Sequence, residues 1–272
     1  MNEQLTYDPI YDVVDPSEFR RLIEVDRYNR RSDAFDPIIS ATNDHFWDPT
    51  DKRYLDFTVP FDIDRDYIMP AHRLPEFRSP LVQALPEDRK ARLANEITRW
   101  QLSAILHGEQ GALSLSAGLC SLLHDAGAQE YAANQAREEA RHVTGFALYI
   151  EHRWGEALPV GDVLGDLLED LVATPIIWKK LVGMQMLLEG LAMGAFANIH
   201  AHTNDPVLKR LVQLVMTDEA FHHRFGKIWA DRTMPKLSQS ERDQIEDWAA
   251  ECFEALLFNL VNIRQKRVVY GQ

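Results

Sequence analysis

Two copies of one short motif constrain this chain more than any other feature of its sequence. Glu139 and His142 form one Glu-x-x-His pair, and Glu219 and His222 form the only other pair. Residues three apart on a helix project from the same face, one turn apart. If each pair lies on a helix, it can therefore present a carboxylate and an imidazole to the same metal ion.

A lone glutamate precedes each pair at the same distance. Glu109 lies 30 residues before Glu139 (139 − 109 = 30), and Glu189 lies 30 residues before Glu219 (219 − 189 = 30). The chain thus carries one half-site twice, each on an expected pair of helices. In helix bundles, two lone Glu residues and two Glu-x-x-His motifs can line one dinuclear site. The spacing therefore predicts four helices related by a pseudo-two-fold axis through a metal pair.

The chemistry of these side chains indicates which metals fit. Four carboxylates and two imidazoles suit iron or manganese better than a metal that prefers thiolates. We expect two Fe ions, with Mn or a mixed Fe/Mn pair as open alternatives. Four buried carboxylates without metal would be costly or would be forced to protonate. The expected ligands, which are also the expected catalytic residues, are Glu109, Glu139, His142, Glu189, Glu219 and His222. Among them, Glu139 and Glu219 are expected to bridge.

A second acid stands immediately before each motif. Glu138 and Asp218 occupy equivalent positions in the two half-sites. A metal-bound histidine usually donates its other N–H to a carboxylate, which orients the ring. We predict that Asp218 supports His142 and that Glu138 supports His222 across the bundle, with Arg141 paired to one of the two acids. Solvated acids at these positions are the alternative.

Small residues flank the two lone acids. Gly108 and Gly111 lie beside the first, and Gly190 and Gly194 lie beside the second. A glycine inside a helix costs about 1 kcal/mol, which is understandable if the small residues leave room for a ligand or allow close helix packing. The residues expected to line an apolar substrate pocket are Ile105, Ala112, Leu113, Phe146, Met193 and Phe196.

Proline and turn signals divide the chain. Residues 1–85 are rich in Asp-Pro pairs and aromatic side chains, which predicts an irregular wrapping arm with one short helix near 17–30. Helical periodicity predicts a metal-binding core over 86–231, in which one long helix begins at Pro175 and runs to about residue 201. A capping box starts a last helix over 236–266. We therefore expect a single all-α domain over 1–272.

Composition excludes several classes of protein. The 272 residues carry 29 Lys and Arg against 42 Asp and Glu, a net charge of −13. This acidity argues against nucleic acid and anionic membranes as partners. Cys120 and Cys252 are too few for a disulfide framework or a Cys-rich metal site. We see no signal peptide and no apolar run close to a membrane span, and we expect a cytoplasmic protein.

The two motifs resemble those of carboxylate-bridged di-iron proteins in the ferritin-like superfamily. The resemblance covers about residues 90–230 and rests on the segments 138–142 and 218–222. They are similar to segments of bacterial multicomponent monooxygenase hydroxylases, ribonucleotide reductase small subunits, acyl carrier protein desaturases and the para-aminobenzoate N-oxygenase group. The resemblance implies a ferritin-like four-helix bundle with extra helices. It also implies a di-iron oxygenase that uses O₂ to hydroxylate, N-oxygenate or desaturate a small apolar or aromatic substrate.

Departures from the family patterns narrow this choice. Phe146 stands where many ribonucleotide reductase subunits have a radical tyrosine, and Val215 stands where the N-oxygenase group has an extra histidine. Met193 replaces a threonine that is common in the multicomponent hydroxylases, and Phe221 replaces the arginine of their second motif. The Cys-x-x-Cys module of rubrerythrins is absent from the sequence.

Partners and alternatives follow from the same resemblance. An oxygenase of this kind needs two electrons per turnover from a reductase or ferredoxin, or from a reducing substrate, and we expect a homodimer. A ferroxidase or metal-storage protein is one alternative, which predicts a large cage and uptake of many irons. A manganese catalase-like enzyme that disproportionates peroxide is another, and a helical scaffold with an unused site is the last.

Overall fold

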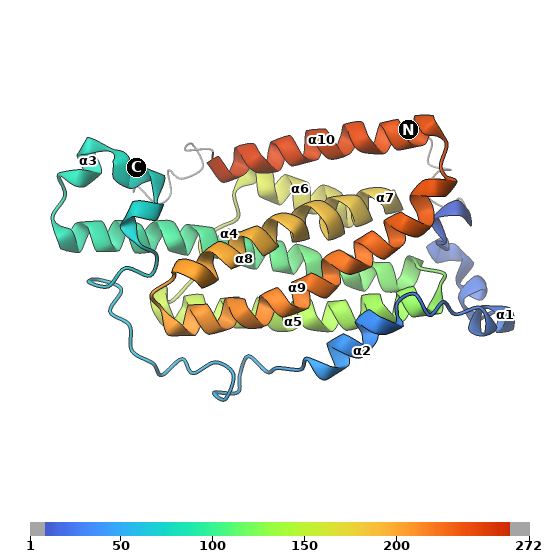
Figure 1. The fold of residues 1–272 in the computed structure, drawn as a ribbon, viewed down its shortest axis with the longest axis horizontal. Helices are drawn as coiled ribbons and strands as arrows, with labels where there is room; N and C mark the ends of the chain where they lie inside the picture. Colours follow the sequence, from blue (N-terminus) through green and yellow to red (C-terminus); the bar gives the residue numbers. More distant parts are fainter. Residues whose placement is uncertain (1–8, 262–272) are drawn as a thin grey trace.

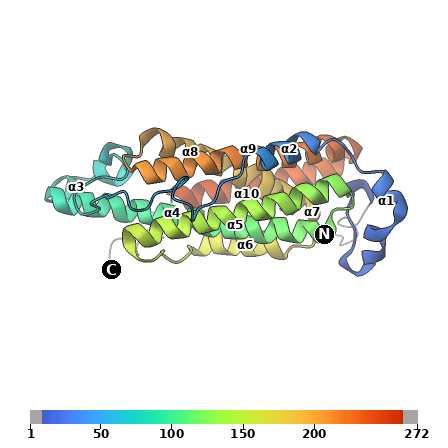
Figure 2. The ribbon, with the colours of Figure 1, turned by 90° about the horizontal axis from the view of Figure 1, so that it is seen from below.

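The computed structural model describes residues 9–261, and every regular element in that range is a helix. An isolated bridge between Val13 and Leu123 is the only strand-like pairing among these residues. The helices form an elongated bundle, with its long axis horizontal in Figures 1 and 2. The prediction of an all-α bundle is confirmed.

Two antiparallel helical hairpins form the centre of the bundle. The first consists of α4 (Glu87–Leu122) and α5 (Ala126–Trp154), and the second of α8 (Glu189–His202) and α9 (Pro206–Thr233). Within each hairpin the two helices lie side by side along their length, and α5 also packs against α9 (Figure 1). The four predicted core helices are therefore present as two hairpins.

Aspartate caps set where the second helix of each hairpin begins. Asp125 accepts hydrogen bonds from the backbone N–H groups of Gly127 and Ala128 at the start of α5. Asp205 does the same for Val207 and Leu208 at the start of α9. A cap of this kind stabilises a helix by about 1 kcal/mol, so both caps favour the tight turns that close the hairpins.

The start of the third core helix differs from the sequence expectation. The helix begins at Ile177, as α7 (Ile177–Lys180), and then widens into a π-helix, η6 (Leu181–Leu188), before α8. The expected long helix from Pro175 to about residue 201 is thus present as a continuous helical stretch from Ile177 to His202, and its π-helical part was not predicted. A Cβ on Gly183 would lie 2.5 Å from Leu171 and 2.9 Å from Trp248. Neighbouring helices therefore press closely on this segment, and π-helices often occur near functional sites.

Two further helices cover the bundle. Helix α6 (Asp162–Ala173) packs on α4, and α10 (Gln239–Val261) packs on α6 and η6. The expected C-terminal helix over 236–266 is present from Gln239, after a short 3-10 turn, η7 (Met234–Lys236). Residues 262–266 of that prediction lie outside the described residues.

The N-terminal segment has more helical structure than expected. Its elements are η2 (Pro9–Tyr11), η3 (Pro16–Ile23), α1 (Val25–Asn29), α2 (Asp36–Asp44), η4 (Ala71–Arg73), η5 (Pro75–Arg78) and α3 (Pro80–Gln83). The prediction of one helix over 17–30 was wrong, because Glu24 is extended and separates η3 from α1. Helix α2 was not predicted, and it packs on both α5 and α9.

Aromatic and aliphatic side chains of this segment are part of the hydrophobic core. Trp47, Leu55 and Ile68 belong to one buried cluster with Phe146 and Phe196. Trp47 is 1% exposed. Burying a large aromatic side chain contributes a few kcal/mol. The segment therefore stabilises the bundle as well as covering it.

One helical stretch, Ile177–His202, is long and apolar enough by length and composition to cross a membrane. The sequence expectation of no such run was wrong on this point. The stretch has a mean hydropathy of 1.2, at the limit for a span, and it contains the buried Glu189. A core helix of a soluble protein passes the same test, so the stretch is weak evidence for a membrane span.

Candidate metal centre

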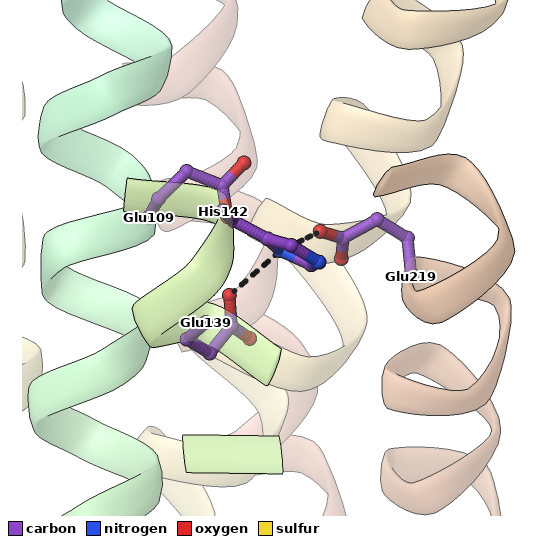
Figure 3. Close-up of side chains that lie close together, drawn as sticks. All are labelled: Glu109, Glu139, His142 and Glu219. Atoms are coloured by element: carbon purple, nitrogen blue, oxygen red, sulfur yellow. Dashed lines mark hydrogen bonds and ion pairs between the residues drawn. The ribbon is translucent and has the colours of Figure 1, made fainter. Parts of the chain in front are cut away.

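The six expected ligands come together in the middle of the bundle. Each hairpin contributes one lone glutamate and one Glu-x-x-His pair, and no ligand side chain is more than 6% exposed. Figure 3 shows four of them, from α4, α5 and α9, pointing toward one another. They are Glu109 on α4, Glu139 and His142 on α5, Glu189 at the start of α8, and Glu219 and His222 on α9.

The two motif glutamates each reach both histidines. The two oxygens of Glu139 lie 3.3 Å from Nδ1 of His142 and 3.0 Å from Nδ1 of His222. The two oxygens of Glu219 lie 3.2 Å from each of the same two nitrogens. A carboxylate with one oxygen directed at each of two positions has the geometry of a bridging ligand.

The two lone glutamates each reach one histidine. Glu109 Oε2 lies 3.2 Å from Nδ1 of His142, and Glu189 Oε1 lies 3.9 Å from Nδ1 of His222. The ligand atoms therefore form two groups, each within 4.8 Å, and the groups share Glu139. The larger group holds Glu109, Glu139, His142 and Glu219, and the smaller holds Glu139, Glu189 and His222. This buried Glu/His cluster could hold a metal ion.

The electrostatics of the cluster fit a site that needs positive charge. Burial, aided by the charge of Glu219, raises the pKa of Glu109 to about 8. Burial also raises the pKa of Glu189 well above its ordinary value. Glu139 Oε2 and Glu219 Oε1 are buried and receive no hydrogen bond. Bound cations or protons neutralise the negative charge of buried carboxylates in this state. The residues present therefore fit a metal pair.

The histidines and the two motif glutamates, Glu139 and Glu219, attract one another strongly. Burial lowers the pKa of His142, but the hydrogen bond to Asp218 and the contacts with three glutamates outweigh it and raise the pKa well above the ordinary value. Burial raises the pKa of Glu219, but the Glu189 hydrogen bond and the charge of His222 lower it to about 2. The cluster thus holds its geometry through mutual charge contacts.

The carboxylates that precede the motifs orient the histidines across the bundle. His142 Nε2 donates to Asp218 Oδ2 at 2.9 Å, and His222 Nε2 donates to Glu138 Oε2 at 3.0 Å. Both rings therefore direct Nδ1 at the cluster. Arg141 donates to Asp218 at 2.9 Å and to Glu138 at 3.4 Å, so it contacts both acids rather than one. All three supporting side chains are buried.

Sequence reasoning missed the contribution of the N-terminal segment. Trp47 Nε1 donates to Asp218 Oδ2 at 2.9 Å, and its ring stacks on His142 with centroids 6.0 Å apart. The guanidinium of Arg141 lies 5.3 Å from the Trp47 ring centroid. His45 Nε2 lies 3.7 Å from the other oxygen of Asp218. No spacing pattern connects positions 171 residues apart, so only the folded chain shows these contacts.

A pair of buried glutamines was also missed, although the sequence held a signal for it. Gln135 Nε2 donates to Glu139 Oε1 at 3.1 Å and to Gln185 Oε1 at 3.2 Å, and it lies 3.4 Å from Glu189 Oε1. Each glutamine stands four residues before a ligand glutamate, and therefore on the same helix face. This repeated spacing could have identified both.

An apolar cavity of about 270 Å³ opens beside the cluster, between α4 and α8. Glu109 and Glu189 are its only acidic lining residues. Of the expected pocket residues, Ile105, Ala112 and Phe196 line it, whereas Leu113, Phe146 and Met193 do not. The complete lining is Trp100, Gln101, Ala104, Ile105, Gly108, Glu109, Ala112, Leu164, Met184, Leu188, Glu189, Leu191, Ala192, Ala195, Phe196, Asn198, Ile199 and Leu256.

Helix geometry explains why Leu113 and Met193 do not line this cavity, and Phe146 is separated from it by Phe196. On α4 the cavity follows the stripe 101, 104, 105, 108 and 112, with Glu109 at one edge. Leu113 lies one turn further along, beyond that edge, because a helix advances more than one full turn in four residues. Met193 bears the same relation to Glu189. Phe146 lies behind the wall, where it stacks on Phe196 with centroids 5.8 Å apart.

Comparison with known proteins adds no relative: no family model matches the chain, and no curated protein is similar to it. The fold and the site therefore carry the assignment. They define an α-helical bundle with a buried, duplicated carboxylate–histidine cluster that could bind metal, next to an apolar cavity.

Proposed function

We propose that this chain is a non-haem di-iron oxygenase of the ferritin-like type, which uses O₂ to hydroxylate, N-oxygenate or desaturate a small apolar or aromatic molecule. The observation that carries this proposal is the apolar cavity, which ends on Glu109 and Glu189 of the cluster. An iron-storage protein would need a hydrophilic iron path instead. When bound, two iron ions would supply the redox chemistry and Lewis acidity.

In this proposal the chain's own residues hold the metals and set the geometry. Glu139 and Glu219, which each reach both histidines, would contribute to both metal positions, and Glu109 and Glu189 would each contribute to one position beside the cavity. The Nδ1 atoms of His142 and His222, which face the cluster, would complete the two positions. Asp218 and Glu138 keep the imidazoles in place by accepting hydrogen bonds from Nε2, and Arg141 holds the two carboxylates in position by donating to both.

The cavity limits the substrate. A cavity of about 150 Å³ holds benzene, so 270 Å³ accommodates one aromatic ring with a short substituent, or a short alkyl chain. A Cβ on Gly108 would meet no atom within 4 Å. Packing inside the protein therefore does not require a glycine at this position, and we propose that Gly108 keeps space for the substrate beside Glu109.

The partners and location belong to the same proposal. Two electrons per turnover come from a reductase or ferredoxin, or from the substrate itself. A chain of net charge −13 offers an acidic surface, which favours a basic donor. We further propose a cytoplasmic homodimer.

The test combines metal analysis with a cavity variant. Metal analysis should find about two metals per chain. With O₂ and a chemical reductant, the protein should oxidise small aromatic or alkyl substrates, and mass spectrometry detects the products. Gly108→Leu should fill the cavity and abolish substrate oxidation while the metal content stays unchanged. Gly118→Leu is the matched control, because it also meets open space on α4 but lies outside the cavity.

Three outcomes would contradict the proposal. Uptake of many irons into a large assembly would indicate storage. Peroxide disproportionation with manganese and no substrate oxidation would indicate a catalase-like enzyme. Substrate oxidation that survives Gly108→Leu unchanged would show that the cavity is not the substrate site.

A further inference from the structure

A layer of buried polar side chains lies on the side of the cluster away from the apolar cavity. Gln135 and Gln185 stand one turn from the ligands Glu139 and Glu189. Two turns from the ligands are Ser116, seven residues after Glu109, and Tyr131, eight residues before Glu139. All four are fully buried, at 0% exposure. We call Ser116, Tyr131, Gln135 and Gln185 the polar layer.

The direction of the helices places the polar layer at one end of the site. Helix α4 runs toward the same end of the bundle at which α5 and the α7–η6 segment begin (Figure 1). Residues that follow Glu109 on α4 therefore lie toward the same end of the bundle as residues that precede Glu139 on α5 and residues of η6 that precede Glu189. Most of the cavity lining runs in the opposite direction, from Glu109 back to Trp100 on α4 and from Glu189 on to Ile199 on α8, while Ala112 and Met184 extend the lining toward the polar layer. Most of the apolar lining therefore lies on the other side of the cluster from the polar layer.

Each member of the polar layer has an atom without a partner. Ser116 Oγ, Tyr131 Oη, Gln135 Oε1 and Gln185 Nε2 are buried and make no hydrogen bond within the described part of the chain. Leaving such a group unsatisfied costs about 1–3 kcal/mol. Native proteins satisfy buried polar groups that lack a protein partner with ordered water.

The packing around the layer keeps these atoms in position. The Tyr131 ring lies 4.9 Å from the ring of Phe225 and cannot turn freely. A Cβ on Gly226 would lie 2.8 Å from the Cβ of Gln185, so glycine there allows α9 to approach η6 closely. Gln135 is fixed by its hydrogen bonds to the ligand glutamate and to Gln185. The packing therefore limits the motion of Tyr131, Gln135 and Gln185.

We propose that the polar layer binds a short chain of ordered water molecules and delivers protons to the metal cluster from the side opposite the substrate. This inference rests on the proposed oxygenase function. Hydroxylation places one oxygen atom of O₂ in the substrate's C–H bond and releases the other as water, which consumes two electrons from the donor and two protons. The hydroxyls of Ser116 and Tyr131 both donate and accept, so they can pass protons between waters. The amides of Gln135 and Gln185 orient the waters nearest the ligands.

The physical need for this route comes from the apolar lining of the cavity. The cavity is walled mostly by aliphatic and aromatic side chains, with Gln101 and Asn198 as its amide side chains, so it offers few hydrogen-bonding partners for protons. Protons and substrate would therefore reach the cluster from different sides. Burial raises the pKa of Tyr131 well above its ordinary value, so the phenol stays neutral and can donate one hydrogen bond while it accepts another.

The first experiment is structural and needs no turnover. A crystal structure of the metal-loaded protein, at a resolution that shows buried waters elsewhere, should show ordered water within hydrogen-bonding distance of Ser116 Oγ, Tyr131 Oη and Gln185 Nε2. If no water lies there, the inference is overturned. Because the protein need not turn over, failure to find oxygenase activity would overturn the proposed function alone.

The second experiment measures proton delivery. Ser116→Ala and Tyr131→Phe should each lower kcat by about tenfold and enlarge the solvent deuterium isotope effect, with KM and metal content unchanged. Ser114→Ala is the matched control, since Ser114 is exposed on the same helix, and it should behave like the unmodified chain. An unchanged isotope effect in both hydroxyl variants, with or without a lower kcat, would overturn the inference.

Discussion

At the scale of single residues, Asp218 connects the cluster to the residues that surround it. It accepts hydrogen bonds from His142, Arg141 and Trp47. Burial raises its pKa, but the hydrogen bond and charge of His142 and the charge of Arg141 lower it to about 2. Asp218 therefore stays ionised and supports an imidazole whose Nδ1 faces the metals.

Replacing Asp218 should loosen one metal position. We expect Asp218→Asn to lower metal affinity by about 10- to 100-fold, because the variant loses the charge that orients His142 and raises its basicity. Competitive metal titration measures the change. Asp247→Asn, an exposed acid on α10, is the control. Equal affinity in both variants would show that Asp218 has no role in metal binding.

Metal binding should release protons, and the direction follows from Glu109. Its raised pKa, about 8 in the metal-free chain, means that it holds a proton below that pH. The metal must displace this proton, and also protons on Glu189 and His142, whose pKa values are raised well above their ordinary values, so apparent affinity should rise with pH through 8. Calorimetry in buffers of different ionisation enthalpy counts the released protons. More release at pH 9 than at pH 6.5 would contradict this prediction.

At the scale of elements, Gly226 lies in close packing and Gly194 faces open space. Substituting each one tests whether packing requires a small residue at that position. A Cβ on Gly226 of α9 would lie 2.8 Å from Gln185, whereas a Cβ on Gly194 of α8 would meet nothing within 4 Å. We expect Gly226→Ala to lower the free energy of unfolding by about 1–3 kcal/mol through overpacking. Gly194→Ala should raise it by up to about 1 kcal/mol through helix propensity. Urea denaturation of the metal-free proteins measures both, and changes of equal sign would contradict the packing argument.

Much of the helical arrangement was predictable because its signals are local. The equal spacing of Glu109 and Glu189 from their motifs required two similar helix pairs, and the structure has them. Asp205 and Pro206 marked the start of α9. The π-helix was not predictable, because Gly183 meets Leu171 and Trp248 only in the folded chain.

The candidate site was predictable in part for the same reason. The positions of the six expected ligands follow from periodicity within four helices. Leu113 and Met193 do not line the cavity, because periodicity predicts which helix face carries a residue but not how far along that face the cavity extends. Trp47 could not be found at all, since its contact with Asp218 depends on the path of an irregular segment.

At the scale of the whole molecule, the cluster joins both hairpins, so a metal pair would crosslink four helices. Ligands that bind only the folded state stabilise it, by about 2.7 kcal/mol at 100 times Kd. We expect saturating metal to raise the free energy of unfolding by at least this amount. Chemical denaturation with metal and with a chelator measures it. Glu189→Ala should reduce the gain, and an equal gain in that variant would contradict the assigned ligand set.

The N-terminal segment makes the two halves of this duplicated site unequal. Asp218, behind His142, receives the Trp47 indole and lies beneath the segment, whereas Glu138, behind His222, has no corresponding aromatic partner among the described residues. The ligands repeat but their environments do not. Two ions would therefore bind with two different affinities, and one position would fill before the other. A repeated ligand pattern can in this way give a heterogeneous pair, with a distinct metal preference at each position.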